Sequence, residues 1–121
     1  MEDAADARPV DRPLLSWMAM HAFEGRPDAA TDPRVDLLGA PLERLGVLPP
    51  TLVITAERDV LRSQGQDWAR RLEEAGVDVT LRHYDGVMHE FFGASAVLAK
   101  AEDAQQEAAR HVLRAFGTAP A

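Results

Sequence analysis

The chain has 121 residues, which is one domain's worth at most. Its 20 acidic and 13 basic residues give a formal net charge of -7, which disfavours binding to nucleic acid or to an anionic membrane because both are polyanions. No apolar run approaches the ~18 residues that a membrane-spanning helix needs. The sequence contains no cysteine, so disulfides, a thiolate nucleophile and a cysteine metal site are excluded.

The N-terminal part combines a polar tail with a short apolar helix. Residues 1–12 are rich in Asp and Ala, and we predict a disordered tail there. The tail lacks the apolar core of a secretory signal, which favours a cytoplasmic protein if Met1 is the native start. Pro13 is suited to the first turn of a helix that runs to about Phe23. This helix is apolar on most sides, so Trp17 and Met18 are interpreted as core residues or, alternatively, as walls of an apolar substrate pocket.

Closely spaced glycines and prolines punctuate residues 24–50, which predicts irregular chain with at most one turn of helix at Pro41–Leu45. Thr51–Ala56 is a short apolar run rich in β-branched residues. It is typical of a strand buried on both faces of a parallel sheet.

The next helix has a clear start and end signal. Ser63 and Gln66 are spaced as a capping box that would open it. Gly76 is suited to the left-handed position that ends it.

A second strand and a last helix complete the chain. Val77–Tyr84 alternates apolar and polar residues, as in a half-buried strand near a sheet edge. Asp85-Gly86 indicates a turn. An alanine-rich helix is then expected from Ala96 to Phe116, with a loose tail at residues 118–121. We therefore predict one α/β domain at residues 13–117, in the order strand–helix–strand–helix.

An acid and a histidine follow the two predicted strands. Asp59 lies three residues past the first strand, and His89 lies five past the second. Parallel strands joined by a right-handed crossover end at one edge of the sheet, where sites form in open α/β sheets. A carboxylate that accepts the Nδ1–H of an imidazole fixes its tautomer, so the other nitrogen can take a proton from a serine. The order acid then histidine is that of the α/β-hydrolases.

Other interpretations of these residues remain open. Asp59 is also suited to capping the next helix, and His89 to a place near a turn. His83 is expected to be a packed or interfacial histidine, and His111 a solvated one. The four histidines of the sequence lack metal-ligand spacing, so no metal site and no cofactor are predicted.

The stretch PPTLVITAERDVLRSQGQDWARRLEEAGVDVTLRHYDGVMHEFF resembles the C-terminal part of the α/β-hydrolase fold-3 esterases, the bacterial hormone-sensitive-lipase-like family. Family members show two prolines, an apolar strand, an acidic residue before a catalytic Asp, D-x-L-R, a helix ending in A-G-V, a strand and H-x-F. The likeness extends over Leu14 to Phe116. It implies that Asp59 is the acid of a catalytic triad and His89 its base. The sequence departs from the family at Glu90, where glycine is common.

The family's H-G-G-G and G-x-S-x-G motifs are absent, and Ser16, Ser63 and Ser95 do not replace the second one. The resemblance thus implies the C-terminal portion of an α/β-hydrolase sheet, without the N-terminal half and the nucleophile elbow. Two parallel strands are too few for an independent sheet, so we expect a homodimer or pairing with the missing half.

The function implied is that of a carboxylic ester hydrolase acting on small-molecule esters without a cofactor. This chain would carry the acid and the histidine of that enzyme but not its nucleophile, and we expect it to be inactive alone. The alternatives are a non-catalytic interaction or dimerisation module and one half of a split enzyme.

Overall fold

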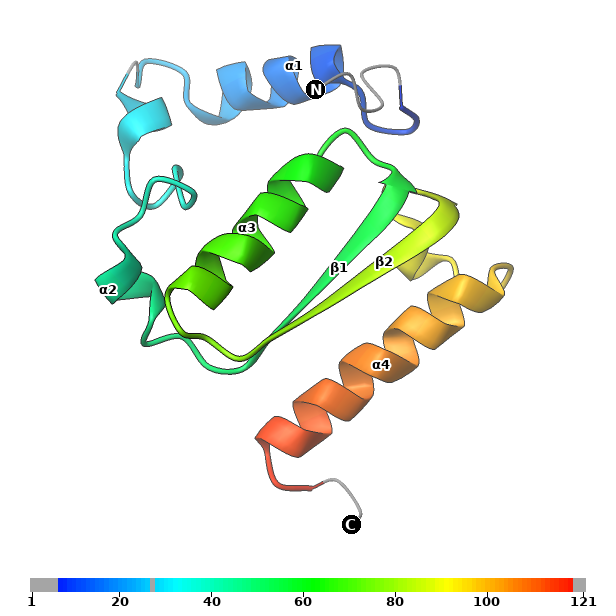
Figure 1. Cartoon of the computed structure of the whole chain (residues 1–121). Helices are drawn as coiled ribbons and strands as arrows, with labels where there is room; N and C mark the ends of the chain where they lie inside the picture. The colour runs from blue at the N-terminus through cyan, green and yellow to red at the C-terminus, as the bar shows by residue number, and fades with distance from the viewer. Residues whose placement is uncertain (1–6, 27, 119–121) are drawn as a thin grey trace.

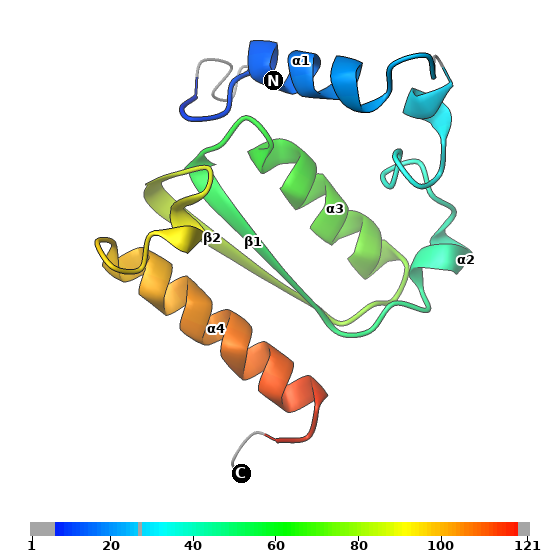
Figure 2. The ribbon, with the colours of Figure 1, turned by 180° about the vertical axis from the view of Figure 1, so that it is seen from behind.

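The computed structural model describes residues 7–26 and 28–118 of the chain. Its centre is a two-stranded parallel sheet of β1 (Thr51–Arg58) and β2 (Val79–Met88). The crossover between them is α3 (Arg62–Glu74), and α4 (Ala99–Ala115) follows the sheet. In both views α3 and α4 lie on opposite sides of the strand pair (Figures 1 and 2). The predicted order strand–helix–strand–helix is confirmed.

Two hydrophobic clusters hold this arrangement together. On the α3 side, Leu72 is fully buried and packs with Ala40, Leu45 and Val77. On the α4 side, the small side chains of the helix let it approach the sheet closely; that cluster consists of Ala56, Val87, Phe91, Ala101 and Ala104. The prediction that β1 is buried on both faces is only partly met, because its first four residues are half-buried and burial is complete only at Thr55 and Ala56.

The register of the strands changes near their carboxyl ends. Ala56 pairs with Tyr84, but the next pair joins Arg58 to Met88, so β2 carries two more residues than β1 in this interval. The turn predicted at residues 85–86 is therefore wrong, since both residues lie within β2. Gly86 has the positive φ of 72° that a turn glycine would have, but the chain uses it in a bulge.

The start of α3 also differs from the prediction. The helix begins at Arg62 with Leu61 at its N-cap, and no side chain caps it, so the capping box of Ser63 is wrong. The reason is that Asp59 already organises this turn by accepting the N–H of Leu61 at 2.8 Å. The end of the helix is as predicted, because Gly76 has a φ of 84°.

The first helix, α1 (Arg12–Ala22), begins one residue before the predicted start, and Asp11 caps it by accepting the N–H of Leu14. The core assignment of Trp17 and Met18 is wrong, because 53% and 47% of their surfaces are exposed. The physical reason is that α1 lies beyond the end to which the strands point (Figure 1) and contributes to neither hydrophobic cluster.

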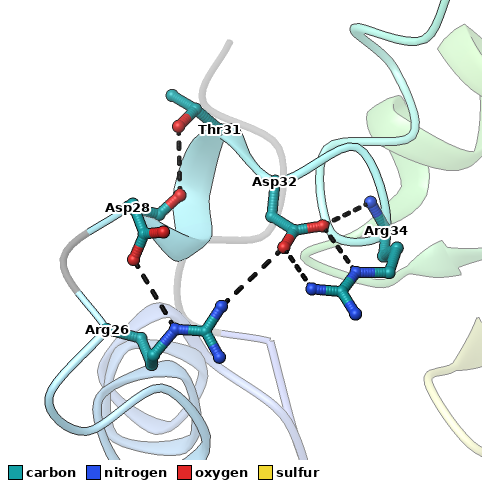
Figure 3. Close-up of polar contacts among 5 residues, drawn as sticks. All are labelled: Arg26, Asp28, Thr31, Asp32 and Arg34. Carbon is teal, nitrogen blue, oxygen red and sulfur yellow. Dashed lines mark hydrogen bonds and ion pairs between the residues drawn. The ribbon is translucent and has the colours of Figure 1, made fainter.

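Residues 24–50 are irregular, as predicted, apart from the short helices η1 (Ala29–Thr31) and α2 (Leu42–Leu45). Hydrogen bonds to the carboxylate of Asp32 stabilise the first part of this segment (Figure 3). Asp32 accepts the backbone N–H of Arg34 at 2.9 Å and two bonds from its guanidinium at 2.9 and 2.6 Å. The guanidinium of Arg26 lies further away, at 3.9 Å.

Residues 1–6 and 119–121 of the two predicted tails lie outside the described residues, whereas residues 7–12 and 118 lie within them. Ala7 and Val10, the apolar residues just before α1, are buried. After α4, Gly117 has a φ of 65°, and Thr118 donates its N–H to the carbonyl of Leu113. In the described part of the chain, no helix combines the length and apolarity needed to cross a membrane.

Candidate active site

The structure brings Asp59 and His89 together at the carboxyl end of the sheet. The Oδ2 atom of Asp59 lies 2.9 Å from Nδ1 of His89, although the two residues are 30 apart in sequence. Their side chains retain 13% and 29% of their exposed surface, respectively. A carboxylate at this position favours the tautomer that carries the proton on Nδ1.

Both carboxylate oxygens of Asp59 are engaged. Oδ2 faces the imidazole, and Oδ1 accepts the N–H of Leu61 at 2.8 Å. The second bond fixes the rotation of the carboxylate, so that Oδ2 is held toward His89. The two interpretations of Asp59 that the sequence left open are therefore compatible: the residue organises the turn before α3 and also contacts the histidine.

The backbone around His89 is fixed by neighbours on both sides. The N–H of His89 donates to the carbonyl of Arg58 at 3.3 Å, which continues the pairing of the strands. Glu90 has a φ of 68°, and this left-handed residue turns the chain into η2 (Phe91–Gly93). Phe91 is buried beneath the loop, whereas Phe92 is 40% exposed.

The second imidazole nitrogen is available for chemistry. Within the described residues, Nε2 of His89 has no hydrogen-bond partner. None of the three serines of the sequence bonds to it in this structure: Ser16 lies on α1, Ser63 on α3, and Ser95 after η2. The described chain therefore holds an oriented acid–histidine pair with an unoccupied nitrogen and no serine bound to that nitrogen.

A cavity of about 470 Å³ lies beside Asp59, between β1, α3 and the irregular segment. Its floor includes Ile54 and Thr55 of β1, and Leu61 and Trp68 line the side of α3. The lining is mainly apolar, with Asp36 and Asp59 as its charged groups. The arrangement fits an apolar group next to the acid–histidine pair.

The other histidines lie away from this pair. Nδ1 of His83 is 3.0 Å from the hydroxyl of Thr55, and its Nε2 is 3.3 Å from Oδ1 of Asp85. The prediction that His111 is solvated is wrong, because it is half-buried and its Nε2 is 3.0 Å from the carbonyl of Pro50. Among the described residues, no group of three potential metal ligands occurs.

Sequence reasoning overlooked two contacts near the site. Glu57 accepts the N–H of Gly86, and Lys100 donates to the carbonyl of Asp85. The family pattern contains an acidic residue at the position of Glu57, which was a usable signal. Nothing in the local sequence around Lys100 indicated its partner, because that partner lies on another element.

The parallel crossover and the acid–histidine pair at its carboxyl end define an α/β protein of the hydrolase class. Residues 1–93 match the sequence profile of a family described as alpha/beta hydrolase fold. The chain therefore belongs to the α/β-hydrolase fold family, in its hormone-sensitive-lipase-like branch.

Individual relatives are esterases. The chain is 37% identical over 95 residues to ethyl acetate hydrolase of Pseudomonas putida, covering 78% of this chain and 29% of that protein. It is 47% identical over 62 residues to neutral cholesterol ester hydrolase 1 of Rattus norvegicus, covering 51% of this chain and 14% of that protein. The solved esterase of Pyrobaculum calidifontis matches with a TM-score of 0.80 and 30% identity, over 97% of this chain and 36% of that structure. The chain thus spans between about a seventh and about a third of the length of these relatives.

Proposed function

We propose that this chain supplies the acid and the histidine of a carboxylic ester hydrolase of the serine α/β-hydrolase type. The observation that carries the proposal is the 2.9 Å contact between Asp59 and Nδ1 of His89, with Nε2 left without a partner among the described residues. The family of esterases to which the chain belongs supports it. In this function Asp59 orients the imidazole, and His89 acts first as general base and then as general acid.

The reaction would be acyl transfer to a serine, followed by hydrolysis of the acyl-enzyme by water. His89 would take the hydroxyl proton at Nε2 and later give it to the leaving alcohol. Asp59 would stay ionised and stabilise the imidazolium that forms in between. The apolar cavity next to Asp59 fits a small-molecule ester substrate, and the chemistry requires no cofactor.

The chain alone lacks the nucleophile motif and the oxyanion-hole motif, so we propose that it is inactive by itself. An oriented histidine without a nucleophile has little to act on. The second candidate is a non-catalytic hydrolase half that acts as an interaction or dimerisation module, or as one half of a split enzyme. The observation that favours it is the exposed apolar surface of α1, where Trp17 and Met20 are 53% and 63% exposed.

Two assays with p-nitrophenyl acetate test the proposal. The first uses the 121-residue protein alone, which is expected to give no hydrolysis above background. The second uses a chimera in which residues 7–118 replace the matching part of the Pyrobaculum calidifontis esterase, which supplies the missing parts of the site. The chimera should hydrolyse the ester.

Substitutions in the chimera separate the two candidate functions. Both His89→Ala and Asp59→Asn should reduce kcat by roughly 10³–10⁴-fold, whereas the matched controls His83→Ala and Asp78→Asn should not. An inactive but folded chimera would favour the non-catalytic module. Hydrolysis by the 121-residue chain alone, lost in His89→Ala, would show that the chain contains a nucleophile and would contradict the proposal of inactivity.

A further inference from the structure

The bulge of β2, between Tyr84 and Met88, lies directly before His89 and determines the position of that residue along the sheet. From Ala56 to Arg58 the chain advances two residues on β1, while from Tyr84 to Met88 it advances four on β2. The two additional residues interrupt the ladder and leave backbone groups without their regular partners. Gly86, with its positive φ, lies within the interruption.

Side chains from two different elements satisfy the backbone of this bulge. Glu57 of β1 accepts the N–H of Gly86, with 2.5 Å between Oε2 and N. Lys100 of α4 donates to the carbonyl oxygen of Asp85, also at 2.5 Å. Each is a charge-assisted hydrogen bond, which is stronger than a bond between neutral groups. Lys100 is the single lysine of the sequence.

The bulge brings His89 into line with Asp59. With the two additional residues present, Met88 pairs with Arg58, and His89 donates its N–H to the carbonyl of Arg58. In a regular ladder, Gly86 would be the partner of Arg58, and His89 would lie two residues further along. At a rise of about 3.3 Å per residue, that is a displacement of roughly 6–7 Å, far beyond hydrogen-bond distance.

We propose that Glu57 and Lys100 are positioning residues, which hold the bulge of β2 and thereby keep Nδ1 of His89 against Asp59. Neither side chain contacts the imidazole or the carboxylate, so both act through the backbone of Asp85 and Gly86. The inference rests on the proposed function for its catalytic meaning, because the residue that it positions is the proposed base. The geometry itself can be measured without any reaction.

Neighbouring contacts between α4 and β2 provide a matched control. Tyr84 donates to Oδ2 of Asp103 at 2.9 Å, and Arg82 lies 3.7 Å from Glu107. These contacts lie along the same pair of elements as the contact of Lys100, but they do not involve the bulge. An effect specific to the bulge must therefore be absent when Asp103 is changed.

The experiment is ¹H–¹⁵N NMR of the imidazoles in the 121-residue protein at neutral pH. In the unmodified protein His89 is expected in the Nδ1–H form, with a proton protected from exchange, and Asp59→Asn serves as the reference for loss of this state. The double variant Glu57→Ala/Lys100→Met should lose the protected proton and shift His89 toward the Nε2–H tautomer. The control Asp103→Asn should keep the signal, although it removes an α4–β2 contact.

Conservative and single variants separate positioning from general stability. Lys100→Arg keeps the cation and Glu57→Gln keeps an acceptor, so both should retain the Nδ1–H signal. If the double variant does not fold, Glu57→Ala and Lys100→Met are measured separately, and each is expected to weaken the protection of the proton.

Two negative results have different meanings. An unchanged His89 tautomer and proton in the double variant or in both single variants, while the amide signal of Gly86 has moved, would overturn the positioning role. Identical His89 signals in the unmodified protein and in Asp59→Asn would instead refute the acid–histidine pairing, and with it the proposed function.

Discussion

At the scale of single residues, carboxylates organise this molecule by accepting backbone N–H groups. Asp59 binds the N–H of Leu61 as well as facing His89, and Asp11 caps α1 through the N–H of Leu14. Asp32 does the same in the irregular segment, where it binds the N–H and the side chain of Arg34. These short-range bonds fix turns that have little hydrophobic core of their own.

The ionisation of Asp32 provides a first prediction. Its hydrogen bonds with Arg34 hold the pKa of the carboxyl well below its usual range. Because the pKa is lower in the folded state, the ionised carboxylate of Asp32 stabilises the folded protein. This stabilisation is complete above the unfolded-state pKa near 3.8 and is lost as the pH falls through the folded-state pKa. The midpoint can be measured by ¹³C NMR of the carboxyl carbon. Arg34→Gln should raise it toward the ordinary value.

Arg26→Gln is the matched control for Asp32, because Arg26 lies at 3.9 Å and is a weaker influence on the carboxyl. It should change the midpoint much less than Arg34→Gln. A larger effect from Arg26→Gln would contradict the assignment of Arg34 as the dominant partner.

At the scale of elements, α3 and α4 attach to the sheet in different ways. On the α3 side, a large leucine is enclosed by α2 and the start of β2. On the α4 side, alanines permit close approach, and polar pairs run along the strand from Lys100 through Asp103 to Glu107. The contact of α3 with the sheet therefore depends on the volume of buried apolar side chains. The contact of α4 depends also on interactions between charged and polar side chains.

Leu72→Ala tests the contact of α3. The side chain is fully buried, so its truncation removes apolar contacts and leaves a cavity. We expect the free energy of unfolding to fall by about 2–5 kcal/mol, measured by urea denaturation followed by circular dichroism. The control Leu113→Ala, at a site that is 42% exposed on α4, should cost much less. Equal losses would indicate that the α3 cluster is not the core of the fold.

The titration of Tyr84 on β2 tests the contact between β2 and α4. Burial raises the pKa of its phenol, and the hydrogen bond to Asp103 raises it further. Because the pKa is higher in the folded state, the neutral phenol of Tyr84 stabilises the folded protein. This stabilisation is fully present below the unfolded-state pKa near 10 and is lost as the pH rises through the folded-state pKa. Tyr84 is the single tyrosine of the sequence, so its titration can be followed directly by ultraviolet absorbance.

Asp103→Asn should lower the pH midpoint of the Tyr84 titration, because the substitution removes the neighbouring negative charge. Part of the upward shift should remain, since burial is unchanged. Asp78→Asn, at the opposite end of β2, should have no effect. An unaltered titration in Asp103→Asn would mean that the contact between Tyr84 and α4 does not form in solution.

At the scale of the whole molecule, a two-stranded sheet leaves much apolar surface uncovered. On α1, Trp17, Met18 and Met20 are each close to half exposed or more, and Phe116 at the end of α4 is 79% exposed. Large apolar side chains exposed together on one helix, as on α1, favour association with another chain. The chain corresponds to only 36% of the solved esterase and 29% of ethyl acetate hydrolase, so most of those relatives' fold has no counterpart in it.

We expect the 121-residue protein to self-associate, with α1 contributing to the contact. Trp17→Glu together with Met20→Glu should reduce the weight-average mass measured by sedimentation at micromolar concentration, because the charges cannot be buried without a partner. Ser16→Glu adds a charge at an exposed site on the same helix and should have a smaller effect. A monomer at all concentrations would contradict this prediction.

The order of the main elements, the family and the pairing of Asp59 with His89 follow from the sequence alone. The apolar run of β1, the stop at Gly76 and the spacing of Asp59 and His89 are local signals, and the crossover rule connects the two strands. Local signals are sufficient here because strand propensity, a left-handed glycine and parallel topology each depend on few neighbours.

The register of β2 and the exposure of α1 could be read only from the three-dimensional structure. Asp85-Gly86 has the composition of a turn, but Glu57 and Lys100, 29 and 15 residues away from the backbone groups that they bind, hold it as a bulge within the strand. Trp17 and Met18 have the composition of a core, yet burial depends on whether another element covers them. Register and burial are properties of pairs of elements, so no single stretch of sequence contains them.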